Sequence, residues 1–186
     1  MKISVYGTGS GEIPKKTLEL ARAVGREIGI RHYTLITGGC WGIPQEAVLG
    51  ANELKGRCIG YSPAISIKEH MDVYHFPTEG FSRLIYIPPD YQHRENKYLS
   101  TKYRNISSVA DCDAAIFIGG RTGTMNEFTI AYDAGKIIGV LEKSGGVCDG
   151  IIRGLVDAVG KQTGAIVMYD PDPASLVGRV VDAFKG

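Results

Sequence analysis

The segment RNISSVADCDAAIFIGGRTGTMNE, which runs from Arg104 to Glu127, contains three local patterns in succession. An apolar run from Ala114 to Ile118 predicts a buried strand. A glycine-rich turn at residues 119–124 comes next. The apolar positions after the turn have helical spacing: Met125, Phe128, Ile130 and Ala131. The segment therefore predicts a strand, a tight turn and the start of a helix.

The glycine-rich turn is predicted to bind a phosphate group. Glycines let the backbone turn tightly and let a ligand approach the main chain, and the N-terminus of the following helix attracts an anion. The dipole of an exposed helix end contributes only about 0.3–1 kcal/mol, so tight binding needs several converging donors. The turn offers backbone N–H groups and two threonine hydroxyls. Its candidate phosphate-binding residues are Gly119, Gly120, Arg121, Thr122, Gly123 and Thr124.

The two ends of this segment also allow a purely structural interpretation. Thr124 and Glu127 fit the capping box S/T-x-x-E, in which the glutamate bonds to the backbone N–H of the cap residue. Arg104, on the helix expected before the strand, would then be a solvated surface charge. The competing interpretation is that Arg104 and Glu127 both face a ligand.

Length and composition favour one α/β domain over residues 1–186. The formal net charge is only +1, which argues against a surface dedicated to nucleic acid or to membranes. The chain has no apolar run of 18 residues, and Met1 leads directly into a predicted strand rather than a signal peptide. We therefore expect a cytoplasmic protein with no membrane partner.

Cysteine and histidine patterns predict neither a metal site nor a disulfide framework. The four cysteines (Cys40, Cys58, Cys112 and Cys148) have no C-x-x-C spacing, and the four histidines form no H-E-x-x-H pair. Cys58, in a predicted strand, is interpreted as a small core residue. We expect that no cofactor is required, and that any bound species is a nucleotide or phosphate.

Strands and helices are predicted to alternate along the whole chain. Strands are expected at residues 3–6, 33–37, 57–61, 83–87, 114–118, 136–141 and 165–169. Helices are expected at residues 14–28, around 47–51, briefly at 67–71, around 97–104, after the turn at 119–124, at 149–159 and at 173–184. Such alternation predicts a three-layer, Rossmann-like, doubly wound α/β fold with a mainly parallel sheet and helices on both faces.

Three glycine turns are predicted to meet at one crevice. They occupy residues 7–11, 38–42 and 119–123, and each follows a predicted strand. In a doubly wound sheet, ligands bind outside the carboxyl ends of the strands, near the point where the strand order reverses. The first two turns therefore add candidate ligand-binding residues, namely Gly7, Gly9, Ser10, Gly38 and Gly39.

The absence of several known phosphate-binding and catalytic motifs limits the classes of ligand that the pocket is predicted to bind. The turn at residues 7–11 is not G-x-G-x-x-G, and the second strand ends in Thr37-Gly38 where a dinucleotide site would have an acidic residue. The Walker pattern and the nucleophile elbow are both absent. The remaining prediction is a pocket for a mononucleotide or another phosphorylated small molecule.

Several of these motifs together resemble the LOG-like (Lonely Guy) superfamily, whose members were once labelled lysine decarboxylases. The resemblance rests on GGCWG at residues 38–42 with Ala47 and Ala51, on Arg104-Asn105 and Ala110-Asp111, and on GGRTGTMNE at residues 119–127. It covers the chain from the first strand to about Leu141. It implies the Rossmann-like fold shared with DNA-processing protein A and the molybdenum cofactor carrier proteins.

The sequence departs from the cytokinin-releasing members at two points. Those enzymes carry P-G-G-x-G-T-x-x-E, whereas this chain has Ile118 in place of the proline and both Arg121 and Thr122 between its Gly-Gly and Gly-Thr pairs. They also carry Arg-Lys where this chain has Arg104-Asn105. Arg-Asn resembles the branch that contains the molybdenum cofactor carriers and many uncharacterised proteins.

The resemblance implies an enzyme that hydrolyses a nucleoside 5′-monophosphate to a free base and ribose 5-phosphate. Glu127 would act at the glycosidic carbon, because a carboxylate stabilises oxocarbenium character or activates water. Arg104 would orient Glu127 or the ribose phosphate. Tyr91 and Arg94 would cover the base, unless they belong to an ordinary surface loop. The resemblance also implies a homodimer.

Two alternatives belong to other functional classes. A carrier or sensor without turnover would use the same crevice for a pterin-type cofactor or an intact nucleotide, and the altered turn and Asn105 favour it. A single-stranded DNA binder related to DNA-processing protein A is disfavoured, because the chain is nearly neutral and lacks a basic, aromatic-rich groove.

Overall fold

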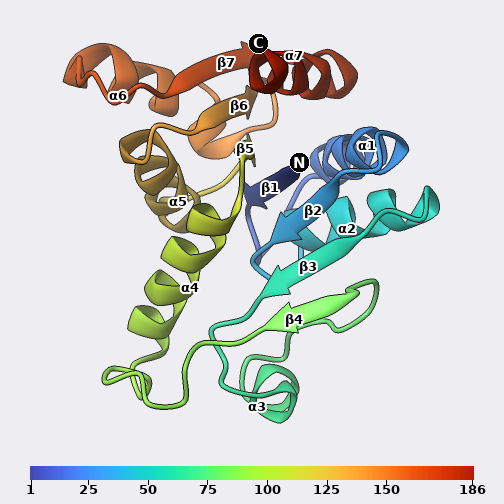
Figure 1. Cartoon of the computed structure of the whole chain (residues 1–186), viewed down its shortest axis with the longest axis vertical. Helices are drawn as coiled ribbons and strands as arrows, with labels where there is room; N and C mark the ends of the chain where they lie inside the picture. The colour runs from blue at the N-terminus through green and yellow to red at the C-terminus, as the bar shows by residue number, and fades with distance from the viewer.

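Seven parallel strands form one continuous sheet in the computed structural model, which describes all of residues 1–186 (Figure 1). The strand order is β4-β3-β2-β1-β5-β6-β7, and every neighbouring pair is parallel. The strands are β1 (Lys2–Gly7), β2 (Thr34–Thr37), β3 (Cys58–Tyr61), β4 (Arg83–Ile85), β5 (Ala114–Ile118), β6 (Ile137–Leu141) and β7 (Ile166–Asp170).

Helices cover both faces of this sheet and bury two separate apolar clusters. The helices are α1 (Lys15–Ile30), α2 (Ile43–Glu53), α3 (Ile67–Asp72), α4 (Lys97–Asp111), α5 (Thr122–Asp133), α6 (Ile151–Val159) and α7 (Pro173–Lys185), with a short 3-10 helix η1 (Gly146–Cys148). One cluster holds residues of α1, α2 and α7, and the other holds residues of α4, α5 and α6 (Figure 1). The predicted three-layer, doubly wound fold is confirmed.

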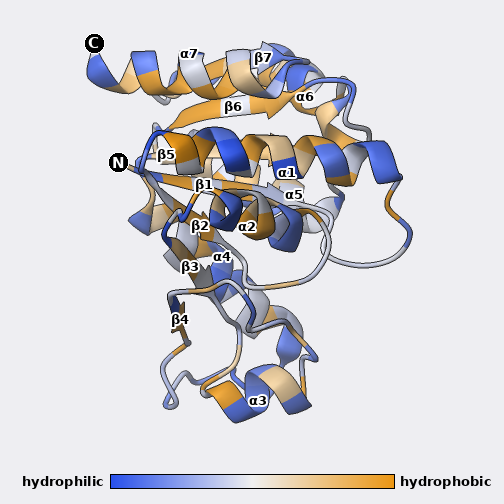
Figure 2. Ribbon diagram, turned by 90° about the vertical axis from the view of Figure 1, so that its right-hand side faces the viewer, coloured by the Kyte–Doolittle hydropathy of each residue, from blue (hydrophilic) through white to orange (hydrophobic).

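The central strands explain how one sheet serves two clusters. Successive side chains of a strand point to opposite faces, and in β5 Ile116 and Ile118 enter the cluster beneath α1 while Ala115 and Phe117 enter the cluster beneath α5. All five residues of β5 are buried. Figure 2 shows the corresponding contrast, with largely apolar inner strands and an α1 helix whose residues alternate in hydropathy. Buried parallel strands are expected to be apolar on both faces.

The strand order reverses between β1 and β5. The chain moves outward from β1 to β4, and α4 then carries it back across the sheet to β5 on the other side of β1. Ligands of doubly wound sheets bind at such a point, beyond the carboxyl ends of the strands. Two of the three predicted glycine turns follow β1 and β5, so the fold places them on either side of the reversal.

Most element boundaries differ from the sequence prediction by a residue or more, and two of these differences have a clear local cause. Strand β4 ends at Ile85 rather than Ile87, ahead of the consecutive prolines Pro88 and Pro89. Helix α6 begins at Ile151 rather than Asp149, because Gly150 has φ +93° and closes the preceding 3-10 turn. None of the helices combines the length and the apolar composition that crossing a bilayer would require.

Candidate functional site

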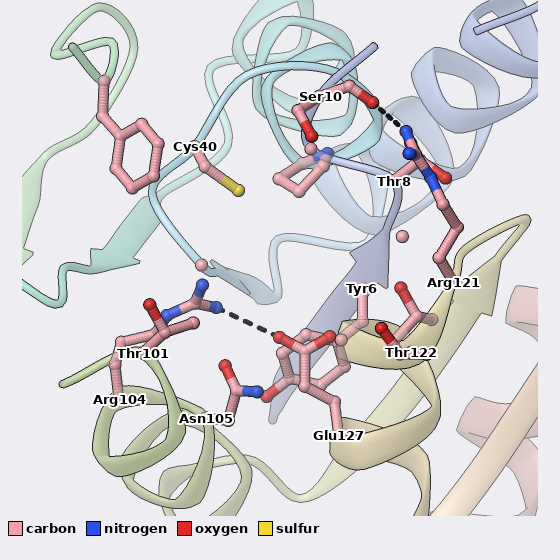
Figure 3. Close-up of a pocket in the computed structure, with 17 residues that line it drawn as sticks. Tyr6, Thr8, Ser10, Cys40, Thr101, Arg104, Asn105, Arg121, Thr122 and Glu127 are labelled. Atoms are coloured by element: carbon pink, nitrogen blue, oxygen red, sulfur yellow. Dashed lines mark hydrogen bonds and ion pairs between the residues drawn. The ribbon is translucent and has the colours of Figure 1, made fainter. Parts of the chain in front are cut away.

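A cavity of about 390 Å³ lies at the carboxyl ends of β1, β2 and β5, and we call it the site cavity (Figure 3). All three glycine turns contribute to its wall, so their predicted convergence is confirmed. Its lining residues are Tyr6, Gly7, Thr8, Gly9, Ser10, Gly38, Cys40, Pro44, Phe76, Thr101, Arg104, Asn105, Arg121, Thr122, Gly123, Thr124 and Glu127.

Three of the predicted ligand-binding glycines lie outside this lining. The N–H of Gly39 donates to Thr37 Oγ1 at 3.2 Å. The N–H of Gly119 donates to Ser144 Oγ at 2.8 Å, and that of Gly120 donates to Thr8 Oγ1 at 3.1 Å. These hydroxyls occupy the donors that were expected to face a phosphate. Gly119 and Gly120 instead shape the turn, with φ of +58° and +93°, and line a neighbouring cavity.

The N-terminus of α5 lies in the wall of the site cavity and has no side-chain cap. The helix begins at Thr122, and its cap residue Arg121 is extended and supplies no side-chain cap. The backbone N–H groups in the first turn of a helix lack partners within the helix, and the residues of this turn, Thr122 to Thr124, line the cavity. The Arg121 guanidinium donates to the backbone carbonyl of Ser10 and so joins the first glycine turn to the third (Figure 3).

The capping-box interpretation of Glu127 is wrong. Because α5 begins three residues earlier than that pattern requires, Thr124 is its third residue rather than its cap. Thr124 is buried, and the Glu127 carboxylate accepts a hydrogen bond from Arg104 instead of from the start of its own helix. Residues 124–127 do match the capping-box pattern, but tertiary packing places Arg104 beside Glu127 and makes it the partner of this carboxylate.

Arg104 and Glu127 form a buried ion pair at the centre of the site cavity (Figure 3). Arg104 Nη1 lies 3.0 Å from Glu127 Oε1, and the two side chains are only 7% and 8% exposed. The surface-charge interpretation of Arg104 is therefore wrong. Gly38 makes room for the pair, since a Cβ at that position would lie 2.1 Å from Arg104 Nη1.

Burial sets the ionisation of the groups around this pair. Burial raises the pKa of Glu127 to about 7, although Arg104 opposes that shift. A carboxyl with such a pKa exchanges readily between its acid and base forms near neutral pH, as a general acid or base must. Burial also raises the pKa of the Cys40 thiol to about 11, which keeps this cavity-lining cysteine protonated.

Two buried polar atoms of the cavity wall have no partner within the protein. They are Arg104 Nε, a donor, and Asn105 Oδ1, an acceptor. Asn105 is only 1% exposed, and its Nδ2 already donates to Asn126 Oδ1 at 2.9 Å. Buried polar groups are nearly always hydrogen-bonded, so these two atoms are available to a ligand or to a water molecule in the cavity.

Sequence reasoning named Arg104 but missed other lining residues, namely Tyr6, Thr8, Cys40, Pro44, Phe76, Thr101 and Asn105. Helical spacing could have identified two of them, because Thr101 lies three positions before Arg104 and four positions before Asn105, so both residues neighbour Thr101 on the surface of α4. Phe76 comes from the least periodic part of the chain, where no such signal exists.

The Pro-Pro loop does not reach the site cavity. Tyr91 packs against Tyr103, with ring centroids 4.7 Å apart, and Arg94 pairs with Glu95. Neither residue belongs to the cavity lining, so the ordinary-loop interpretation describes them better. No three His, Cys, Asp or Glu side chains gather closely enough to form a metal-binding group.

Comparisons with known proteins place these features in context. The model of the SLOG cluster4 family matches residues 1–177. An uncharacterized protein from Archaeoglobus fulgidus is 29% identical over 143 residues, which is 76% of this chain and 82% of the relative. The X-ray structure of TM1055 superposes with a TM-score of 0.78 at 20% identity and covers 98% of each chain.

Two further solved structures come from proteins with known ligands. The molybdenum cofactor binding protein of Rippkaea orientalis has a TM-score of 0.74 at 21% identity, over 100% of this chain and 97% of its own. DNA processing protein A from Helicobacter pylori, which binds single-stranded DNA, has a TM-score of 0.66 at 15% identity, over 98% and 81%. At these identities the likeness establishes a shared fold.

Proposed function

Since this chain belongs to the SLOG cluster4 family, we propose that its site cavity binds a nucleoside 5′-monophosphate and hydrolyses the N-glycosidic bond to a free base and ribose 5-phosphate. The observation that carries the proposal is the juxtaposition, in one cavity, of an unfilled helix N-terminus and a buried Arg–Glu pair. The first feature suits a phosphate, and the second suits a carbon that becomes positively charged.

The phosphate of the ligand lies at the N-terminus of α5. The N–H groups of Thr122, Gly123 and Thr124 belong to the first turn of this helix and lack partners within it, and the helix dipole favours the negative charge. Gly123 has open space around it, so a ligand atom can approach its backbone directly. The hydroxyls of Thr122 and Ser10 add donors on the same wall. This arrangement meets the requirement for several converging donors.

Glu127 acts at the glycosidic carbon, C1′. The bond from C1′ to the base nitrogen breaks with oxocarbenium character, which a neighbouring carboxylate stabilises. A water oxygen then bonds to C1′; one of its protons stays on the new hydroxyl, and the other passes through Glu127 to the departing base. Because the pKa of Glu127 is about 7, it can accept and return that proton near neutral pH.

Arg104 positions Glu127 and favours its charged form. Its Nη1 holds Glu127 Oε1, and an adjacent positive charge opposes the effect of burial on the carboxyl pKa. Arg104 Nε, which has no protein partner, remains available for a ligand oxygen. Asn105 Oδ1 remains available for a ligand donor on the same side of the cavity.

A second candidate function is binding without turnover. The hydrogen bond from Arg104 Nη1 to Glu127 Oε1 favours it, because a carboxylate held by its own arginine can act as a rigid wall for a carried ligand. A phosphate-bearing pterin or an intact nucleotide would then occupy the site cavity. The fold is shared with the molybdenum cofactor binding protein from Rippkaea orientalis, so a fold of this kind can hold such a ligand.

Base release distinguishes these functions. Purified protein is incubated with a panel of nucleoside 5′-monophosphates, and free bases are separated by liquid chromatography. We expect the native protein to release a base and Glu127→Gln to release it at least a hundredfold more slowly. Glu19→Gln serves as the control and should leave the rate unchanged, because the Glu19 side chain is 65% exposed on α1. Nucleotide or pterin that copurifies with the protein, without base release from any nucleotide, would replace hydrolysis with the carrier function.

A further inference from the structure

The end of the site cavity away from α5 is bounded by an aromatic side chain that the proposed chemistry does not use. Figure 3 shows Cys40 and Thr101 on one side of the Arg104–Glu127 pair, and Thr122 and Arg121 on the other. Phe76 lies on the Thr101 side, because its ring packs against Tyr74 at 5.6 Å, and Tyr74 and Thr101 together line the adjoining hollow. A ligand that spans the cavity from the N-terminus of α5 to Phe76 would therefore pass Glu127.

Phe76 is the aromatic residue of the lining with a ring free to meet a ligand. Tyr6, the other aromatic residue, is 1% exposed and donates its hydroxyl to Ser108 Oγ at 2.9 Å. Phe76 is only half-buried, although it contributes to the cavity wall. An apolar ring kept partly uncovered in a polar cavity is suited to stacking on a flat ligand.

The buried side chain of His70 packs against the Phe76 ring and is itself held by hydrogen bonds. His70 is fully buried and lies edge-on to Phe76, with ring centroids 5.6 Å apart and an interplanar angle of 73°. Its Nε2 is 3.0 Å from the Pro77 carbonyl, which only accepts, so Nε2 carries the proton. Its Nδ1 then accepts from the Ser62 hydroxyl at 2.8 Å. This chain of bonds fixes the residue after Phe76.

The same segment is anchored to the second glycine turn. Trp41 Nε1 donates to the His75 carbonyl at 2.6 Å, and the Phe76 N–H donates to the His70 carbonyl at 3.1 Å. His75 adopts φ +54°, a conformation that non-glycine residues seldom adopt without such constraints. Bonds on both sides of Phe76 therefore present its ring in one orientation, and a preorganised ring loses little entropy when it binds a ligand.

We propose that the Phe76 ring stacks on the base of the bound nucleotide. The site cavity would then select ligands that carry a flat heteroaromatic ring at the end away from the phosphate. This inference rests on the proposed function, because it places the base of the bound nucleotide. Stacking on an aromatic side chain tolerates every base. Discrimination among bases then falls to polar atoms of the cavity wall, of which Arg104 Nε and Asn105 Oδ1 are buried and unpaired.

The test measures binding of two probes in the Glu127→Gln background, which removes turnover. Adenosine 5′-monophosphate carries a base, and ribose 5-phosphate does not. Titration calorimetry compares Phe76→Ala, Phe76→Leu and Phe76→Tyr, with Tyr98→Ala as the control because Tyr98 is 83% exposed and lies outside the site cavity.

We expect Phe76→Ala to weaken nucleotide binding about tenfold or more and to leave ribose 5-phosphate binding within twofold. Phe76→Tyr should restore nucleotide binding, and Tyr98→Ala should change neither affinity. If circular dichroism shows that Phe76→Ala is unfolded, the same two affinities are compared for Phe76→Leu, because leucine keeps apolar volume without an aromatic face. Equal effects of a folded variant on both probes, or no effect on either, would overturn the inference while the proposed function stands. Failure of the parent protein to bind either probe would remove the proposed function itself.

Discussion

The guanidinium of Arg104 reaches Glu127 only because position 38 carries no side chain. A Cβ there would lie 2.1 Å from Nη1 and 2.8 Å from Cζ of Arg104. We expect Gly38→Ala to displace the arginine, to lower the free energy of unfolding by about 1–3 kcal/mol through overpacking, and to reduce base release at least tenfold. Thermal melts and the chromatographic assay measure these effects.

A matched substitution controls for the loss of a glycine. Gly178 lies within α7, and a Cβ there would have no neighbour within 4 Å. Gly178→Ala should therefore leave base release unchanged and raise stability by roughly 0.5–1 kcal/mol, because alanine is the better helix former. If Gly38→Ala behaves like Gly178→Ala, the steric account of the Arg104 position is wrong.

Glu127 is expected to make stability fall as pH rises. Its pKa is about 7 in the folded protein and has an ordinary value of 4.5, so between these pH values the folded state binds the extra proton. Its contribution is complete below about pH 4.5 and is lost as pH rises through 7, a change of about 3 kcal/mol. Urea titrations of the native protein and Glu127→Gln at several pH values measure this difference.

His70 contributes in the opposite direction over part of the same range. Burial lowers its pKa below 6.5, so its stabilising effect is present above pH 6.5 and is lost as pH falls through the lower value. For this reason the relevant quantity is the native free energy of unfolding minus that of Glu127→Gln, in which the His70 effect cancels. A difference that stays constant from pH 4.5 to 7 would mean that Glu127 is not protonated on folding.

At the scale of one element, the first turn of α5 supports the phosphate site through its backbone. Proline suits the first position of a helix, and the preceding residue, Arg121, is already extended at φ −132° and ψ −153°. Thr122→Pro should therefore fold, but it removes one N–H donor. We expect it to bind ribose 5-phosphate roughly tenfold more weakly than Thr122→Ala, since both lack the hydroxyl. Equal affinities of the two variants would contradict a role for this N–H group.

Elements with strong periodicity were predictable from the sequence, and side-chain partnerships were not. The run from Ala114 to Ile118 identified β5 at its observed boundaries, because a buried parallel strand is continuously apolar. The capping box failed because it is a local pattern, whereas Glu127 is bonded 23 positions away in sequence. Likewise, the N–H of Gly119 donates to Ser144 and the N–H of Gly120 donates to Thr8. These partners are distant in sequence, so no local motif predicts them.

The motifs carried more information together than separately. The resemblance to the LOG-like superfamily rested on glycine turns, an Arg-Asn pair and a downstream glutamate, and the SLOG cluster4 match over residues 1–177 confirms it. In the structure, the strand order brings the distant glycine turns to one edge of the sheet. The place of Phe76 in the cavity wall could not be predicted from the sequence, because it depends on contacts with His70, Pro77 and Trp41 rather than on any periodic pattern.

At the scale of the whole molecule, charge argues for a small ligand rather than a nucleic acid. The net charge is +1, with 21 basic and 20 acidic residues, and nucleic-acid affinity depends on many uncompensated cations. We expect no binding of a fluorescent oligothymidine strand by anisotropy at low salt, under conditions where ribose 5-phosphate binds. Binding that weakens steeply with added salt would instead reveal a DNA-binding surface like that of its structural relative from Helicobacter pylori.

In the proposed complex, one cavity aligns a phosphate, a glycosidic carbon and a carboxylate. The most direct measurement is a crystal structure of Glu127→Gln bound to adenosine 5′-monophosphate. We predict the phosphate within hydrogen-bond distance of the N–H groups of Thr122 to Thr124, C1′ beside Gln at position 127, and adenine stacked on Phe76. A phosphate bound in the neighbouring cavity around Ser144 and Gly145, or a C1′ remote from position 127, would contradict the account.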